Sequence, residues 1–352
     1  MLVADGRALT YAQVSTKAAA LAAALAELGI GTGDRIAIVM PNWPEWVISL
    51  LAASKLGATV VPVNPRLSYH ELKYQLRHAE VSAVVALERH HGVDYLQMFE
   101  DMIAELPDLL YLITVGGEEL WYDDRIFQFE DLVSSGAGRD VPAVVVEDDS
   151  DLALMYTSGT MGKPKGVRLS HRAIVETAQL TGELLEMEPA DRVLAAVPFF
   201  TLFGLGVLIE TLAAGATLVL QDEFDAARAV TLLQQERVTV MHGVPTMYQL
   251  IMRAANFDAD AFPRLRSGIV AGGAVSEELV RRIRRWCNVQ LSYGLTETGP
   301  TMTMTRFTDP ADKRLTTVGR ALPGVEIKVV DIVTGALHGP EAVGEIAVRG
   351  PN

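Results

Sequence analysis

The stretch YTSGTMGKPKGV, from Tyr156 to Val167, decides how the rest of the chain is interpreted. It combines threonine and serine hydroxyls with three glycines and two lysines inside twelve residues. Glycines let backbone N–H groups approach an anion closely, hydroxyls donate further hydrogen bonds, and lysines neutralise the charge of a polyphosphate. We therefore predict a phosphate-binding loop. The alternative is an ordinary polar loop between a strand and a helix.

This loop is not a Walker A sequence. That pattern needs a glycine five positions before the Gly-Lys pair and a serine or threonine after it, where this chain has Thr157 and Pro164. The stretch instead resembles the nucleotide-binding signature of the adenylate-forming superfamily, YTSGTTGxPKGV, with Met161 in place of the second threonine. The superfamily includes acyl-CoA synthetases, luciferases and the adenylation domains of peptide synthetases. The resemblance implies that ATP phosphates are bound by Thr157, Ser158, Gly159, Thr160, Gly162, Lys163 and Lys165.

Composition excludes several classes of protein. The chain has 352 residues, too many for one compact core, and a net charge of −14, which argues against a nucleic-acid surface. Its single cysteine, Cys287, excludes an internal disulfide and a cysteine-based zinc site, and fits a reducing cytoplasm. No apolar run reaches membrane-spanning length, and Asp5 and Gly6 interrupt the only candidate signal peptide.

Strand and helix patterns alternate along most of the chain. Capping-box spacings at Thr10 and Ser68 open two of the helices, and short apolar runs between helices read as strands. Because parallel strands need crossover helices, the pattern predicts an α/β fold of two stacked βα subdomains with mostly parallel sheets flanked by helices. We expect a helix over 90–106, which makes His90 and His91 surface residues, and an irregular segment over 116–151.

The expected division is into three parts. Residues 41–185 form a first α/β subdomain with the phosphate loop, and residues 1–40 join 186–300 in a second one. After Thr301 the helices stop, and short strands separated by turns predict a partial small β-barrel over 301–352.

Two further motifs follow predicted strands. They are Gly272-Gly273-Ala274 and Tyr293-Gly294-Leu295-Thr296-Glu297. Ligands of parallel sheets lie beyond the carboxyl ends of strands, so both motifs are expected to form one crevice with the loop at Gly159. The second motif is the YGxTE of the same superfamily. The resemblance implies that Tyr293 stacks near adenine, that Thr296 contacts phosphate, and that Glu297 holds Mg²⁺ with Thr160; Thr160, Lys165 and Glu297 are the implied catalytic residues.

The segment PFFTLFG, residues 198–204, bears on the acid substrate. Relatives commonly carry histidine where this chain has Thr201, whose hydroxyl cannot become cationic near neutral pH. Relatives that activate amino acids carry an aspartate in this region, and none is present, so an ammonium would be uncompensated. We predict a fatty, aromatic or alicyclic carboxylic acid. Candidate pocket residues are Thr201, Phe203, His242 and Val244, with a core role as the alternative for the last three.

The predicted activity is ATP-dependent conversion of this acid to an acyl-adenylate, followed in the complete enzyme by thioester formation with coenzyme A. The alternatives are an adenylation domain that loads a carrier protein, and a catalytically incompetent fragment that binds ATP and acid. Members of the superfamily continue past the motif that GEIAVRGP, residues 344–351, resembles, into a mobile C-terminal domain. We therefore expect a truncated, weakly active chain whose exposed strand edges over 330–352 favour self-association.

Overall fold

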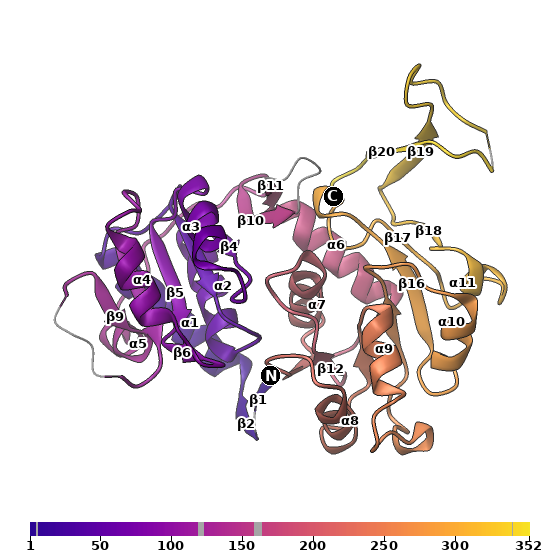
Figure 1. Cartoon of the computed structure of the whole chain (residues 1–352), viewed down its shortest axis with the longest axis horizontal. Helices are drawn as coiled ribbons and strands as arrows, with labels where there is room; N and C mark the ends of the chain where they lie inside the picture. The colour runs from indigo at the N-terminus through magenta and orange to yellow at the C-terminus, as the bar shows by residue number, and fades with distance from the viewer. Residues whose placement is uncertain (5, 119–122, 158–163, 340) are drawn as a thin grey trace. The chain divides into compact units, whose positions relative to one another are not determined.

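We describe a computed structural model of the chain over residues 1–4, 6–118, 123–157, 164–339 and 341–352 (Figure 1). The chain divides into two compact units. The first comprises residues 1–171, 198–204 and 220–223, and the second comprises 172–197, 205–219 and 224–352. Each unit is described by itself. The alternating pattern is confirmed: each has parallel strands connected through helices.

The first unit contains a seven-stranded sheet in the order β11-β10-β4-β3-β5-β8-β9. Its strands are β3 (Arg35–Val39), β4 (Thr59–Pro62), β5 (Ala83–Leu87), β8 (Tyr111–Val115), β9 (Ile126–Gln128), β10 (Asp151–Thr157) and β11 (Lys165–Ser170). All neighbours are parallel except β10 and β11. The central strands β4 and β5 are buried along their whole length, as strands covered on both faces must be.

Helices cover this sheet, with α2 (Pro44–Leu56) on β3 and β4, α4 (Tyr95–Ile103) on β5, and α5 (Phe129–Gly136) on β8 and β9. The alanine-rich α1 (Tyr11–Glu27) packs on α2 and α5. The capping box predicted at Thr10 is present: Thr10 Oγ1 accepts from the Gln13 amide at 3.2 Å. The one predicted at Ser68 opens α3 (Tyr69–His78). The strands β1 (Leu2–Ala4) and β2 (Arg7–Leu9) form an antiparallel pair.

Two local predictions are wrong. The segment 116–151 is not irregular throughout, because it contains β9 and α5. The helix expected to start at His90 starts at Tyr95, and a small antiparallel hairpin of β6 (Arg89–His90) and β7 (Val93–Asp94) precedes it. The physical reason is the turn, since His91 and Gly92 have φ of +48° and +80°, and a helix cannot continue through left-handed residues.

The second unit carries β12 (Arg192–Ala195) between β14 (Val240–Met241) and β13 (Thr217–Leu220). It also carries β15 (Gly268–Val270) and β16 (Val289–Tyr293), which are parallel, and β17 (Thr303–Met304) and β18 (Arg320–Ala321), which continue that sheet in antiparallel fashion. Its helices are α6 (His171–Leu184), α7 (Leu202–Ala213), α8 (Ala226–Gln235), α9 (Pro245–Ile251), α10 (Glu277–Ile283) and the one-turn α11 (Lys313–Thr316), with 3₁₀ turns η1 (Ala259–Ala261) and η2 (Thr296–Thr298).

The last part of the chain is rich in strands, as predicted. β19 (Glu326–Val330) pairs with β20 (Glu345–Arg349) in an antiparallel ribbon, and the segment joining them exposes Ile332, Val333, Leu337 and Val343. The expected division at residues 40, 185 and 300 stays a prediction. Within residues 1–40, however, β3 pairs with β4 and β5 in the first unit's sheet. Among the described helices, none combines the length and hydropathy needed to cross a bilayer.

Candidate functional site

The glycine-rich stretch lies in the first unit, between two paired strands. β10 and β11 run antiparallel with Thr157 directly opposite Lys165, and Thr157 is half-buried while Lys165 is exposed. The stretch therefore joins a strand to a strand and not to a helix. Its role in phosphate binding, against that of an ordinary polar loop, stays a prediction. The other predicted phosphate-binding residues lie outside the described residues: Ser158, Gly159, Thr160, Gly162 and Lys163.

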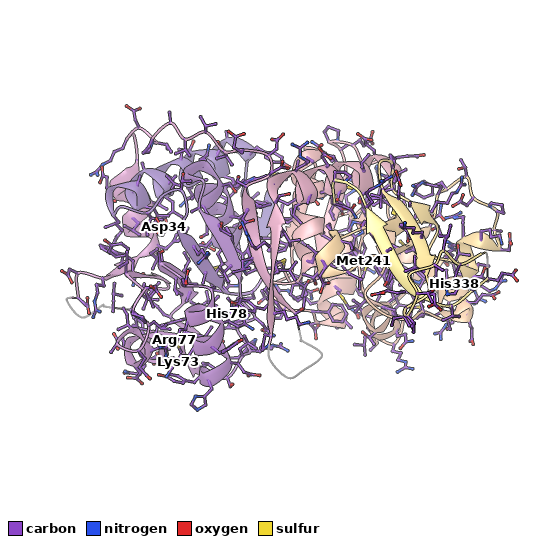
Figure 2. The ribbon with its side chains drawn as sticks, turned by 90° about the horizontal axis from the view of Figure 1, so that it is seen from above. Asp34, Lys73, Arg77, His78, Met241 and His338 are labelled. Carbon is purple, nitrogen blue, oxygen red and sulfur yellow. The ribbon has the colours of Figure 1, made fainter. Side chains whose placement is uncertain are left out.

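Tyr156 anchors the strand end just before the glycine-rich stretch. Its hydroxyl donates to the Gln75 carbonyl at 3.2 Å and lies 2.7 Å from Nδ1 of His78, which projects from α3 (Figure 2). Burial of this phenol raises its pKa to about 12, so it stays a neutral hydrogen-bonding group across the physiological range. The entry to the stretch is thus held to α3 by a side chain of the motif itself.

The two other motifs meet at one cavity in the second unit. β15 and β16 are parallel, with Gly268 opposite Val289, so their carboxyl ends lie at the same edge of the sheet. A cavity of about 770 Å³ lies at that edge. Its lining includes Gly272, Gly273 and Ala274 from the first motif and Tyr293, Gly294 and Leu295 from the second. These two motifs therefore line one cavity, while the loop at Gly159, which was expected to share it, lies outside the described residues.

Two glycines allow the backbone to take this shape. Gly272 has φ of +76°, and a Cβ there would lie 3.1 Å from Cγ1 of Val244, which places the predicted substrate residue Val244 beside the first motif. At Gly294 a Cβ would lie 2.6 Å from the Pro300 carbonyl oxygen, closer than real contacts allow. A side chain at Gly294 would displace the backbone that borders the cavity, and one at Gly272 would strain its left-handed conformation and press on Val244.

The turn η2 carries Thr296 and Glu297. It is closed by the Thr298 hydroxyl, which accepts from the Leu295 amide at 3.1 Å, and the Thr298 carbonyl accepts from the Asn352 side-chain amide at 2.6 Å. Thr296 is half-buried and Glu297 is exposed, with no ion pair to it among the described residues. Its carboxylate is therefore accessible as a hard oxygen ligand, the kind that Mg²⁺ prefers.

The cavity residues that sequence reasoning missed include one segment and one serine. One is the segment Thr316, Thr317 and Val318, which begins at the last residue of α11 and lines the wall. The other is Ser292, which is buried, lines the cavity, and has a hydroxyl with no hydrogen-bond partner among the described residues. The only available signal for Ser292 was its position next to Tyr293 at a strand end. The segment 316–318 gave no such signal, because tertiary packing alone brings it to the cavity.

The remaining substrate candidates have structural partners. The Thr201 hydroxyl donates to the Pro198 carbonyl at 2.7 Å and accepts from the Gly204 amide at 3.1 Å, so it caps the start of α7. His242 is fully buried, with Nε2 at 2.7 Å from Oε1 of the buried Glu210. Phe203 is half-buried on the first turn of α7. For Thr201 and His242 the contacts favour the alternative of a structural role.

Comparison with known proteins defines the class of protein. The family model of AMP-binding enzymes matches residues 1–352, and the chain belongs to that family. A CoA ligase of Rhodococcus jostii, named for a methyl-dioxo-octahydroindenyl propanoyl group, is 33% identical over 99% of this chain and 68% of its own length.

Solved structures share the fold. The anthranilate CoA ligase AuaEII, in complex with anthranoyl-AMP, matches with a TM-score of 0.90 and 26% identity over 99% of this chain and 66% of its own. ATP-bound MatB from Rhodopseudomonas palustris matches with a TM-score of 0.87 and 26% identity over 100% of this chain and 67% of its own. The resemblance to the adenylate-forming superfamily and the α/β fold predicted from it are confirmed. The chain spans about two thirds of the length of the curated relatives it matches, from 58% to 68%.

Proposed function

We propose that this chain carries the ATP and acid sites of an AMP-forming acyl-CoA synthetase. The observation that supports this most is the cavity at the carboxyl ends of β15 and β16, which two separate motifs of the AMP-binding family line together. The relatives named for CoA ligase activity, and the solved relatives titled as holding ATP or anthranoyl-AMP, support the same reaction class.

The proposed first step is adenylation of a carboxylic acid. A carboxylate oxygen attacks the α-phosphorus of ATP, a new P–O bond forms, the bond to the β-phosphate oxygen breaks, and pyrophosphate leaves. In the complete enzyme the coenzyme A thiol then attacks the acyl carbonyl, loses its proton, and AMP leaves. Because both reactants of the first step are anions, the protein must supply positive charge and fixed orientation.

The residues are assigned by motif and by accessibility. We assign binding of the ATP phosphates to the glycine-rich stretch. Its residues for this role are Thr157, Ser158, Gly159, Thr160, Gly162, Lys163 and the exposed Lys165. Gly272, Gly273, Ala274, Tyr293, Gly294, Leu295 and Thr296 bind the nucleotide around the cavity. The exposed Glu297 fits a magnesium ligand, with Thr160 as a second, and Mg²⁺ when bound would neutralise phosphate charge.

We propose a fatty, aromatic or alicyclic acid as substrate. The Thr201 hydroxyl already caps a helix, so it does not replace the histidine that relatives carry at this position. Val244 is an apolar side chain beside Gly272, and an ammonium group next to it would be costly to desolvate. The ring-containing acids in the relatives' names agree with this class.

Pyrophosphate exchange tests the proposal. The chain is incubated with ATP, Mg²⁺, labelled pyrophosphate and a panel of fatty, aromatic, alicyclic and amino acids, in parallel with Glu297→Ala and with the control Glu278→Ala. Like Glu297, Glu278 is exposed, but it lies in α10 and not in the η2 turn of the second motif. We expect exchange with non-amino acids that Glu297→Ala loses and Glu278→Ala keeps. Absence of exchange and of ATP binding by calorimetry would reject the nucleotide site.

A further inference from the structure

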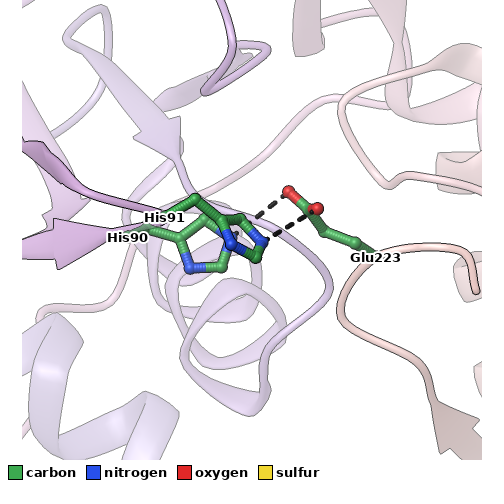
Figure 3. Close-up of side chains that lie close together, drawn as sticks. All are labelled: His90, His91 and Glu223. Atoms are coloured by element: carbon green, nitrogen blue, oxygen red, sulfur yellow. Dashed lines mark hydrogen bonds and ion pairs between the residues drawn. The ribbon is translucent and has the colours of Figure 1, made fainter.

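Two histidines and a glutamate converge in the first unit, and none of them belongs to the motifs of the proposed ATP site. His90 Nε2 lies 3.2 Å from Oε1 of Glu223, and His91 Nε2 lies 3.1 Å from Oε2 of the same carboxylate (Figure 3). One potential ligand atom from each residue lies within 4.8 Å of the other two. We call these three residues the His-Glu cluster. The sequence analysis assigned both histidines to a helix and gave them no partner.

The β6–β7 hairpin presents both imidazoles. His91 and Gly92 form its two-residue turn with φ of +48° and +80°, the signs that a type I′ turn requires, and His90 is paired with Val93. Asparagine or glycine is preferred at such a position, because a left-handed conformation costs other residues about 1–2 kcal/mol. A histidine held in this conformation beside a carboxylate indicates a use for its side chain.

The other members are held independently of the turn. His90 is largely buried, with its ring edge-on to Trp43 at 6.5 Å between centroids. Glu223 follows Asp222, whose carbonyl accepts from the Asn42 backbone amide at 3.3 Å. The side chain of Glu223 is 21% exposed and that of His91 is 66% exposed, so the cluster opens to solvent on the side of His91. Three ligands fixed by separate contacts, with one open side, give a preorganised cation site.

The distances match a metal coordination shell. With zinc bonds of about 2.0–2.2 Å, two ligands of a tetrahedral ion lie roughly 3.3 Å apart. The two N–O separations of 3.1 and 3.2 Å run to different oxygens of the carboxylate and are hydrogen-bond lengths, and they are also close to that ligand–ligand distance. We propose that His90, His91 and Glu223 bind a borderline divalent cation of the Zn²⁺ type through two imidazole Nε2 atoms and one carboxylate, with the remaining position open to water. The ion would fasten the segment 220–223 to the hairpin within the first unit.

A neighbouring cation competes for the carboxylate. Arg66 Nη2 lies 2.5 Å from Glu223 Oε2, and its side chain is 70% exposed. Partial burial raises the pKa of Glu223, but hydrogen bonds from Arg66 and His90 outweigh that effect and the net pKa is lowered. Because Arg66 is exposed, it can turn away when a divalent ion replaces it.

The test is titration of the whole chain with Zn²⁺ by calorimetry and with Co²⁺ by visible absorption, which reports tetrahedral coordination. We expect one ion per chain, and at least about tenfold weaker binding in His90→Ala and Glu223→Gln. His70→Ala is the matched control, because His70 is an exposed histidine outside the cluster, and it should bind like the unmodified chain.

Two variants separate metal binding from damage to the fold. His91→Gly removes a ligand but suits the turn, so it should weaken binding at least about tenfold while raising stability. Arg66→Gln removes the competitor and should strengthen binding. Lack of stoichiometric Zn²⁺ binding would overturn the proposal, as would equal binding by His91→Gly and the unmodified chain, or equal loss in His70→Ala. None of these outcomes depends on the adenylation activity.

Discussion

The cavity at the ends of β15 and β16 and the buried pair of Glu210 and His242 are built differently, although both lie in the second unit. The cavity is bordered by short contiguous segments, where glycine backbone and the nearby exposed Glu297 leave room for a ligand. The pair joins two buried side chains that are 32 positions apart in the chain. This difference predicts which property of the protein each substitution should change. Changes around the cavity should alter ligand binding, and changes in the pair should alter stability.

The largest effect is expected at the buried pair. His242→Leu leaves the Glu210 carboxylate buried without His242 beside it, and loss of one partner of a buried pair typically costs about 3–5 kcal/mol. We expect a fall of that order in the free energy of unfolding, measured by urea denaturation. The double variant Glu210→Leu with His242→Leu removes both polar groups and should recover most of the loss. If His242→Leu is as stable as the unmodified chain but raises the KM for the acid, His242 is a substrate contact.

The second-largest effect is expected at Glu297, where a substitution should lower the activity and leave the stability unchanged. Glu297→Ala should lower pyrophosphate exchange about a hundredfold, equivalent to about 2.7 kcal/mol. Its free energy of unfolding should stay within about 0.5 kcal/mol of the unmodified chain, because the side chain is exposed. Glu278→Ala should change neither quantity. Equal exchange by the two variants would remove Glu297 from the site and weaken the contrast between cavity and buried pair.

A glycine pair tests whether the backbone of the cavity acts as described. In Gly294→Ala the new methyl would lie 2.6 Å from the Pro300 carbonyl oxygen, so the backbone must move. We expect a loss of about 1–3 kcal/mol in stability together with weaker ATP binding by calorimetry. In Gly273→Ala the nearest atom is 3.7 Å away, an ordinary contact, so this control should fold normally. Equal stability of the two variants would show that the approach at Gly294 is relieved without cost.

The cavity shows which residues of a site could be predicted from the sequence and which could not. Tyr293 and Gly272 were placed correctly at one crevice, because both follow parallel strands and the carboxyl ends of neighbouring parallel strands meet at one edge. Thr316 could not be found, since it reaches the cavity only through tertiary packing. The roles assigned to the residues of the crevice and of the glycine-rich stretch stay predictions, as does the division at residues 40, 185 and 300.

The His-Glu cluster is a group of residues that the sequence could not bring together. His91 and Glu223 are 132 positions apart, and no spacing rule connects a hairpin turn to a loop residue so far along the chain. The apolar periodicity after His90 predicted a helix that started too early, because it carried no information about two left-handed residues. A glycine after a histidine was the local signal for the turn, and it was outweighed by the pattern that follows it.

The smallest effect is expected at Thr201, where the two kinds of role can be separated. Its hydroxyl accepts from the Gly204 amide and donates to Pro198, so Thr201→Ala should cost about 1 kcal/mol of stability through loss of a helix cap. Thr201→Ser keeps that hydroxyl and should restore the stability. Since the hydroxyl is engaged within its own turn, we expect the KM for the acid in pyrophosphate exchange to change less than twofold in both variants. A raised KM in Thr201→Ala with unchanged stability would assign the hydroxyl to the substrate and give the cavity a polar contact outside its glycine motifs.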